Sequence, residues 1–354
     1  MRNNYARFLI TGGAGFIGSN LVKYTVNRGF TVLNYDKLTY AGSLVSLESL
    51  LGEKNYAFIR GDICDREKLD EVFRSFAPDV VLHLAAESHV DRSIDGPSDF
   101  IETNVFGTFT LLEAARKYHA SLLPEDASNF RFLHVSTDEV FGSLGLEGCF
   151  DENTPYSPRS PYSASKAASD HLARAWFHTY GLPTIVTNCS NNYGPCQFPE
   201  KLIPHVILSA FAKKALPVYG DGGNVRDWIF VEDHCRALME IAERGEVGET
   251  FLIGGDSERT NLEVVRAICG ILDNISPRGD GGRYDELITF VKDRPGHDRR
   301  YAMDASKLKS SLGWKPSRTF EEGLRETVKW YIDNHKWTDG ILSGNYRLSR
   351  IGLG

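Results

Sequence analysis

The sequence predicts an α/β protein with a doubly wound parallel sheet and a smaller C-terminal α/β lobe. Three observations lead to this prediction. Short apolar runs alternate with longer amphipathic stretches, a glycine-rich turn joins the first run to the first stretch, and turn residues become denser after about residue 190. Continuous β-branched and aliphatic runs, each followed by a helix, are typical of a parallel sheet covered on both faces.

The predicted elements follow this alternation along the chain. Strands are predicted over residues 7–11, 31–35, 56–60, 80–84, 130–135 and 184–187, where β-branched and aliphatic residues run together. Helices are predicted over residues 16–28, 69–76, 99–119 and 163–180, which are amphipathic. Clustered glycines predict a turn over 220–223 and a surface loop over 276–282.

The length of 354 residues indicates more than one lobe, since a single core stops growing at roughly 250–300 residues. Residues 1–190 are expected to form the domain that holds the sheet. Residues 191–340 are expected to form mainly the smaller lobe, with some crossing of the chain between the two, and residues 341–354 a tail of uninterpreted sequence.

The composition excludes several classes of protein. With 42% hydrophobic and 25% charged residues, the chain is neither disordered nor fibrous. A net charge of −7 gives no electrostatic reason to bind nucleic acid or an anionic membrane. The six cysteines form no C-x-x-C pair, which indicates reduced thiols in a cytoplasmic protein and no zinc site. No apolar run approaches the ~20 residues that span a bilayer.

The segment Gly12–Gly18 lies between the first predicted strand and the first predicted helix, and has glycines at positions 12, 13, 15 and 18. These glycines permit a tight turn, a close approach to a pyrophosphate and close packing of the helix on the sheet. The N-terminus of the helix offers free N–H groups to phosphate. Glycines also serve ordinary turns, but the order of strand, glycines, helix and strand predicts a Rossmann-type dinucleotide-binding domain.

Asp36 closes the second predicted strand, where an acid accepts hydrogen bonds from the adenosine ribose. Its carboxylate would repel a 2′-phosphate, which favours NAD over NADP, although Lys37 beside it weakens that preference; the alternative is an ordinary turn-forming aspartate. Asp62 is a candidate for the adenine edge, or else a turn residue. The small residues of 84–86 let a cofactor approach the end of the fourth strand.

Tyr162 and Lys166 are four residues apart at the start of a predicted helix, and so share one face of it. A nearby ammonium favours phenolate, so we expect Lys166 to lower the pKa of Tyr162 until the tyrosine can take a proton from an alcohol. The pattern also occurs by chance on surface helices. Downstream of a nucleotide-binding turn, it predicts oxidation of an alcohol with hydride transfer to NAD⁺.

The segment Ser136–Glu139 follows the fifth predicted strand, at the edge where open α/β sheets bind ligands. Thr137 provides the hydroxyl that a dehydrogenase needs, whereas Asp138 and Glu139 are surplus to hydride transfer. The two carboxyls suit an elimination, in which one group removes a proton beside a new carbonyl and the other protonates a leaving hydroxyl. The alternative is that Asp138 caps a turn and Glu139 is solvated.

The chain resembles the nucleotide-sugar 4,6-dehydratases of the extended short-chain dehydrogenase/reductase family from about residue 6 to about residue 335. The resemblance rests on motifs at residues 11–18, 38–42, 85–93, 136–140, 162–166, 191–195 and 294–298. It implies NAD as a retained cofactor, a nucleotide-glucose substrate with thymine favoured as the base, and a 4-keto-6-deoxy product that leads to deoxysugars such as rhamnose.

The resemblance also implies roles for individual residues. Thr137 and Tyr162 would act at the carbon-4 hydroxyl with Lys166 holding the tyrosine, Glu139 at carbon 5 and Asp138 at carbon 6. Cofactor contacts are expected at Gly12, Gly15, Phe16, Ile17, Gly18, Asp36, Lys37, Thr39, Gly42, Asp62, Ile63, Leu84, Ala85, Ala86, Ser88, Asn104, Tyr162, Lys166 and Asn192. Substrate contacts are expected at Ser88, His89, Thr137, Asp138, Glu139, Asn191, Lys201, Leu202, Pro217, Tyr219, Arg226, Asn261, Arg294 and His297.

Other functions share parts of this pattern. A nucleotide-sugar 4-epimerase uses the same fold, NAD and the Tyr/Lys pair, but has no use for Asp138 and Glu139. A dehydratase acting on UDP-glucose differs by a few base contacts, and a noncatalytic NAD-binding protein would be expected to lose Tyr162 or Lys166. The resemblance implies a homodimer that pairs through the predicted helices over 99–119 and 163–180.

Overall fold

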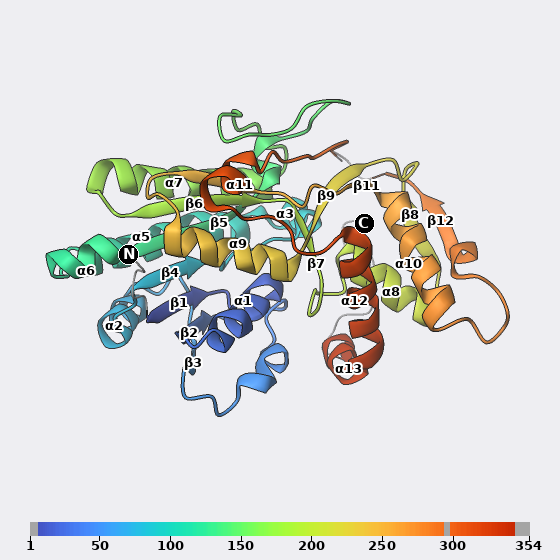
Figure 1. Cartoon of the computed structure of the whole chain (residues 1–354), viewed down its shortest axis with the longest axis horizontal. Helices are drawn as coiled ribbons and strands as arrows, with labels where there is room; N and C mark the ends of the chain where they lie inside the picture. The colour runs from blue at the N-terminus through green and yellow to red at the C-terminus, as the bar shows by residue number, and fades with distance from the viewer. Residues whose placement is uncertain (1–5, 294–297, 344–354) are drawn as a thin grey trace.

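A parallel sheet of seven strands forms the centre of the computed structural model, which describes residues 6–293 and 298–343 (Figure 1). The strand order is β10-β6-β5-β4-β1-β2-β3, and every neighbouring pair is parallel. The strands are β1 (Arg7–Thr11), β2 (Thr31–Asp36), β3 (Tyr56–Arg60), β4 (Val80–His83), β5 (Arg131–Thr137), β6 (Thr184–Cys189) and β10 (Thr250–Ile253). This arrangement confirms the predicted α/β class with a doubly wound sheet.

Helices cover both faces of the sheet because its strands are apolar on both sides. In β1, Phe8 and Ile10 pack toward one face, whereas Leu9 packs toward the other. The first face is covered by α1 (Phe16–Asn27), α9 (Val231–Arg244) and α11 (Ser306–Leu312). The second is covered by α2 (Arg66–Phe76), α5 (Thr108–His119) and α7 (Pro161–Tyr180).

The segment predicted as helix over residues 99–119 is helical throughout, but its first half is not a regular α-helix. The segment divides into α4 (Pro97–Phe100), a π-helical stretch η2 (Ile101–Gly107) and α5. In η2, the Asn104 side chain turns inward and forms hydrogen bonds of 2.8 and 2.9 Å with the Glu87 backbone. We attribute the wide turn to these tertiary contacts, which helix periodicity does not encode.

The smaller lobe packs beside the sheet and has its own apolar core. It contains α8 (Leu202–Phe211), α10 (Asn261–Ile275), α12 (Phe320–Asp333) and α13 (His335–Ser343). Its short strands are β7 (Asn191–Tyr193), β8 (Leu216–Tyr219), β9 (Val225–Phe230), β11 (Glu258–Thr260) and β12 (Ile288–Val291). Between β9 and β11 the chain returns to the large sheet through α9 and β10, so the two parts share the chain, as in Figure 1.

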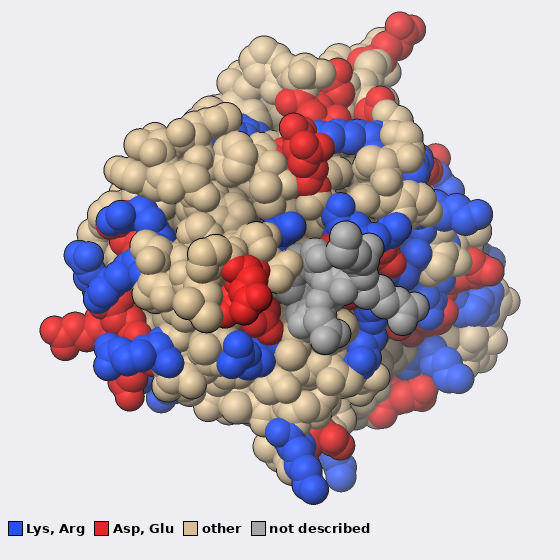
Figure 2. All heavy atoms as spheres, turned by 60° about the vertical axis from the view of Figure 1, so that its left-hand side comes forward, with Lys and Arg blue, Asp and Glu red and all other residues tan. Residues whose placement is uncertain are grey.

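Short elements complete the described part of the chain. They are η1 (Leu44–Leu50), α3 (Val90–Asp95), α6 (Pro124–Asn129), η3 (Asp138–Phe141) and η4 (Tyr284–Leu287). Within residues 6–293 and 298–343, none of the helices has both the length and the apolar character that a bilayer crossing requires. On the face drawn in Figure 2, basic and acidic side chains are interspersed rather than segregated.

We expect the central strand β5 to be sensitive to loss of apolar volume. Leu133 is 0% exposed, so Leu133→Ala should lower the free energy of unfolding by about 2–5 kcal/mol, measured by denaturant titration. The matched control is Leu146→Ala at a side chain that is 92% exposed, where the change should stay within about 0.5 kcal/mol. Equal losses in both variants would contradict this account of the core.

Candidate active site

A cleft opens at the carboxyl ends of the parallel strands, beside the smaller lobe. Its lining comes from the segments that follow β1, β2, β3, β4, β5 and β6, from the start of α7, and from residues that precede α8. We call it the central cleft. Ligands of open α/β sheets bind at this edge, because the loops that leave the strands converge there.

The glycine turn at one end of the central cleft has no room for side chains. A Cβ on Gly18 would lie 2.0 Å from the carbonyl oxygen of Gly12, and one on Gly12 would lie 2.6 Å from the amide nitrogen of Ala85. Gly12 also has a φ of +72°, which favours glycine. The turn therefore holds α1 close to the ends of β1 and β4, with the N-terminus of α1 lining the cleft.

Asp36 lies beside this turn at the end of β2, with 8% of its surface exposed. Its carboxylate accepts hydrogen bonds from the amides of Ala14 at 2.9 Å and Leu38 at 2.8 Å. Burial nevertheless raises the pKa of Asp36. Backbone amides thus hold a buried carboxylate at the position where the hydroxyls of a ribose would be recognised.

Lys37 and Asp62 face each other across the next part of the cleft, with their charged atoms 2.6 Å apart. Hydrogen bonds from the Cys64 amide and from Lys37 overcome partial burial and lower the pKa of Asp62. The positive charge of Lys37 is therefore paired with the carboxylate of Asp62. The glycine turn, the buried Asp36 and the open N-terminus of α1 together fit the predicted dinucleotide.

The structure brings together all of the predicted cofactor-binding residues except one. The lining of the central cleft includes Gly12, Gly15, Phe16, Ile17, Gly18, Asp36, Lys37, Thr39, Gly42, Asp62, Ile63, Leu84, Ala85, Ala86, Ser88, Tyr162, Lys166 and Asn192. Asn104 lies behind the lining, 1% exposed, and supports the Glu87 loop and Ser165 through its side chain. Asn104 is therefore placed to shape the cleft rather than to touch a ligand there.

The predicted catalytic residues gather at the other end of the cleft. Thr137 ends β5, Asp138 and Glu139 begin η3, and Tyr162 and Lys166 lie on the first turns of α7. All five line the central cleft. A capping box between Ser160 and Ser163 fixes the start of α7, and therefore the position of Tyr162.

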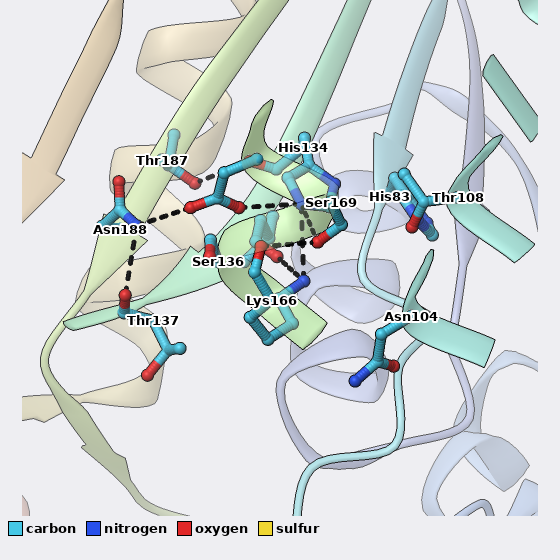
Figure 3. A network of polar contacts seen from close by, with 12 residues as sticks. His83, Asn104, Thr108, His134, Ser136, Thr137, Lys166, Ser169, Thr187 and Asn188 are labelled. Atoms are coloured by element: carbon cyan, nitrogen blue, oxygen red, sulfur yellow. Dashed lines mark hydrogen bonds and ion pairs between the residues drawn. The ribbon is translucent and has the colours of Figure 1, made fainter. Parts of the chain in front are cut away.

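The expectation that Lys166 lowers the pKa of Tyr162 was wrong for this structure. Burial and the carboxylate of Glu139 raise the pKa of Tyr162, against the effect of a hydrogen bond with Thr137. The Lys166 ammonium donates to the Val135 carbonyl at 2.9 Å. It also lies near His134, as Figure 3 shows. Burial and the Glu139 charge therefore keep the phenol protonated, and the ammonium of Lys166 donates to β5 instead.

Asp138 and Glu139 provide the two carboxyls that the sequence predicted. Burial and the neighbouring Glu139 raise the pKa of Asp138 to about 8, and the charge of Arg226 opposes that rise. Asp138 Oδ2 is buried and makes no hydrogen bond within residues 6–293 and 298–343. Asp138 is therefore a carboxylic acid at neutral pH, available as a proton donor in the cleft.

Residues predicted to bind the substrate divide into two groups. Ser88, Thr137, Asp138, Glu139, Asn191 and Lys201 line the central cleft. Lys201 spans it, because its ammonium donates to the Ser88 carbonyl at 3.3 Å. His89 lies just behind, where it caps α3 and approaches Glu200 at 3.7 Å. Arg294 and His297 lie outside the described residues.

The remaining predicted contacts lie in the smaller lobe, outside the lining of the cleft. They are Leu202 at the start of α8, Pro217 and Tyr219 on β8, Arg226 on β9 and Asn261 at the start of α10. Arg226 is the one of these five residues whose positive charge acts on Asp138, where it opposes the rise in the pKa of the carboxyl. Its guanidinium donates to the carbonyls of Val225 and Asp298 at 2.7 and 2.9 Å.

Glu200 is a cleft residue that the sequence analysis missed. Its side chain is 3% exposed and lies 3.5 Å from the Arg92 guanidinium. Tyr40, from the segment after β2, donates to Glu200 at 3.4 Å and packs under Arg92 at 3.7 Å. Its place next to Lys201, a predicted substrate contact, could have indicated a cleft position. A glutamate in a loop is ordinarily exposed to solvent, so the sequence gives no reason to expect it to be buried.

Comparison with known proteins identifies the family. The family model described as GDP-mannose 4,6 dehydratase matches residues 9–327. This chain belongs to that family. A dTDP-glucose 4,6-dehydratase of Neisseria meningitidis is 58% identical over 352 residues, which cover 98% of this chain and 99% of the relative.

Solved structures of this dehydratase family have the same fold. The dTDP-glucose 4,6-dehydratase of Bacillus anthracis, in complex with NAD, superposes with a TM-score of 0.84 at 45% identity, over 95% of this chain and 99% of that one. The enzyme DesIV of Streptomyces venezuelae, with NAD and TYD bound, superposes with a TM-score of 0.86 at 43% identity and the same coverage.

We expect Asp138 to release its proton near pH 8 in this family member. Because burial raises the pKa above its usual value, the neutral acid should persist through pH 7 and ionise as the pH rises through about 8. Difference infrared spectroscopy of the protonated carboxyl band would follow this titration. The Asp138→Asn variant should lack the band change, and a wild-type carboxyl already ionised at pH 6 would contradict the assignment.

Proposed function

We propose that this chain is a dTDP-glucose 4,6-dehydratase that converts dTDP-glucose to dTDP-4-keto-6-deoxyglucose and water, with NAD as a retained cofactor. One observation carries the proposal: Tyr162, Asp138 and Glu139 line the same cleft as the dinucleotide cradle, and Asp138 is a neutral acid there. The relative that is 58% identical over 98% of this chain supports thymine as the base.

The first stage is oxidation at carbon 4 of the glucose. When bound, NAD⁺ supplies the hydride acceptor for carbon 4 and later returns that hydride to carbon 6. Tyr162 takes the proton of the carbon-4 hydroxyl, and the Thr137 hydroxyl hydrogen bonds to the same oxygen. Burial and the Glu139 charge raise the pKa of Tyr162, and added positive charge in the cleft, as an oxidised cofactor would supply when bound, would lower it.

The second stage is loss of water across carbons 5 and 6. The 4-keto group acidifies the carbon-5 hydrogen, and Glu139 removes that proton. Asp138 gives its proton to the carbon-6 hydroxyl, which leaves as water while the electron pair from carbon 5 forms the double bond. After the hydride returns to carbon 6, Glu139 gives its proton back to carbon 5. The proton that Tyr162 took from the carbon-4 hydroxyl then passes to Asp138, so that Tyr162 is again a base and Asp138 again an acid.

Binding of the diphosphate calls for fixed positive charge in a chain whose net charge is −7. Lys201 at the start of α8 and Arg226 on β9 provide it from the smaller lobe, with Asn191 as a hydrogen-bonding partner. We further propose that Tyr219 stacks on the base, that Asn261 lies beside the nucleotide and that Arg294 and His297 approach the nucleotide.

The deciding experiment offers the purified protein a panel of nucleotide-glucoses and follows the product by mass. A loss of water with dTDP-glucose, faster than with UDP-glucose, is the expected result. An unchanged mass together with inversion at carbon 4 would identify a 4-epimerase. No turnover of any nucleotide sugar would overturn the proposal.

We expect Glu139→Gln to separate oxidation from elimination. Oxidation at carbon 4 uses Tyr162 and Thr137 and should persist, whereas removal of the carbon-5 proton should fail. The expected signature is bound NADH with a sugar that keeps its carbon-6 hydroxyl, measured by absorbance and mass spectrometry. Full dehydration by this variant would remove Glu139 from its assigned role.

We also propose a cytoplasmic homodimer. Ile101, Phe106 and Tyr180 are each 52% exposed, and Phe109 is 37% exposed, although all four are large and apolar or aromatic. Phe106, Phe109, Trp176 and Tyr180 form one chain of ring contacts across η2, α5 and α7. A contiguous exposed apolar area of this kind is typical of a subunit interface. The six cysteines, all free thiols, favour a reducing compartment.

Phe106→Asp should convert the proposed dimer to a monomer, because it places a charge in the apolar contact area. Analytical ultracentrifugation at micromolar concentration would measure the change. Leu146→Asp, at a position that is 92% exposed and far from these rings in sequence, is the control and should remain dimeric. A monomeric wild-type protein would contradict the dimer.

A further inference from the structure

Tyr162, Lys166, Asp170 and Arg174 occupy every fourth position of α7 and so lie along one stripe of the helix. The first two belong to the proposed catalytic machinery. Asp170 lies one turn beyond Lys166 and is 0% exposed. A carboxylate removed from water in this way is retained only with strong partners, so its contacts carry information about its role.

Asp170 has partners on two neighbouring elements. Its Oδ1 lies 3.1 Å from Nε2 of His134 on β5. Its Oδ2 accepts hydrogen bonds from Nδ2 of Asn188 on β6 at 3.1 Å and from the Tyr156 hydroxyl at 2.8 Å. One carboxylate therefore ties α7 to the adjacent strands β5 and β6.

These partners lead to the catalytic residues. Asn188 Nδ2 also donates to the Thr137 carbonyl at 3.1 Å, at the end of β5 where the reaction takes place. His134 Nε2 lies 3.5 Å from the Lys166 ammonium, which donates to the Val135 carbonyl. Figure 3 shows Asn188 directed at Thr137 and His134 directed at Lys166.

We propose that Asp170 is a positioning residue for the reaction. Its carboxylate holds Thr137 through Asn188, fixes the His134 ring of β5 beside Lys166, and balances the buried ammonium charge. The inference rests on the proposed function and extends it beyond the residues that touch the substrate. Asp170 itself lies outside the lining of the central cleft.

The charges around Lys166 support this role. Burial lowers the pKa of Lys166, and the carboxylate of Asp170 on α7 opposes that fall. Tyr162, also on α7, is a neutral phenol because burial raises its pKa. From β5 and β4, burial lowers the pKa of His134 to about 4 and lowers that of His83, so both are neutral. From β6, burial raises the pKa of the Cys189 thiol to about 12. Arg174, the next residue of the stripe, donates to Tyr156 at 2.7 Å.

The test isolates the oxidation step, because Asp138 titrates near pH 8 and would mask a change in Lys166 during full turnover. The background is therefore Glu139→Gln, in which the rate of NADH formation with dTDP-glucose is measured against pH in single turnovers. Adding Asp170→Asn removes the charge at nearly constant volume. NADH formation should slow about ten- to a hundred-fold through misplacement of Lys166 and Thr137.

The pH profile distinguishes positioning from a merely structural role. Removal of the Asp170 charge lets Lys166 lose its proton more readily. The fall in the rate of NADH formation at high pH, which we call the alkaline limb, should therefore move to lower pH by about one pH unit. Binding of the nucleotide sugar should be unchanged, because Asp170 lies outside the cleft lining. Adding Asp170→Glu instead restores the charge and should return the limb toward its original position.

Asp233→Asn is the matched control in the same background. Asp233 is a 1% exposed aspartate of α9 that accepts hydrogen bonds from the Ser317 amide and the Arg236 guanidinium at 2.9 Å. Its replacement should lower the Tm but leave the rate and the alkaline limb of NADH formation unchanged.

Failure of this inference is distinguishable from failure of the proposed function. If Glu139→Gln alone forms no NADH and the wild-type protein dehydrates no nucleotide sugar, the proposed function is wrong. Suppose instead that NADH forms in the Glu139→Gln background. Asp170 then has no positioning role if Asp170→Asn changes neither the rate of NADH formation nor its alkaline limb, or changes them no more than Asp233→Asn does. Should Asp170→Asn fail to fold, His134→Gln removes the ring that lies beside both Asp170 and Lys166. A slower rate of NADH formation in that variant supports the positioning role, and an unchanged rate refutes it.

Discussion

Two buried carboxyls of this protein are held in opposite protonation states. Burial and the nearby Glu139 keep Asp138 protonated, whereas the hydrogen bond from His134 and nearby positive charge overcome burial and lower the pKa of Asp170. The difference lies in the neighbours, not in depth, since both side chains are almost fully removed from water. In the proposed reaction the protonated Asp138 donates a proton, and in the proposed positioning role the ionised Asp170 balances the charge of Lys166.

The parallel sheet is what allows these groups to meet. Thr137, Asp138 and Glu139 leave the end of β5, and Asn188 lies beside them on β6, because adjacent parallel strands end at the same edge. The smaller lobe closes over that edge through Lys201 and Glu200, which reach Ser88 and Tyr40 across the cleft. A retained cofactor and a two-stage reaction on one sugar both require such an enclosed site.

Local sequence signals predicted most of the sheet and the cofactor cradle. The apolar runs gave each of the six predicted strands to within a few residues, since burial on both faces leaves a continuous signature. The π-helical stretch within the predicted helix over 99–119 was not foreseen, because it depends on hydrogen bonds between Asn104 and the Glu87 backbone, which helix periodicity does not encode. Glu200 was missed for a similar reason: its burial comes from Tyr40 and Arg92, distant in sequence.

The sequence by itself determined which groups are available: the glycines at 12, 15 and 18, the acid at 36, the pair at 138 and 139, and the tyrosine and lysine four residues apart. These follow from spacing along one strand or helix, which the chain specifies locally. Only the tertiary structure decided how each group is protonated and what it faces. Burial raised the pKa of Tyr162 where a neighbouring lysine suggested the opposite, because the ammonium is held by the Val135 carbonyl. A pKa depends on every charge and dipole within reach in three dimensions, and those neighbours come from separate strands.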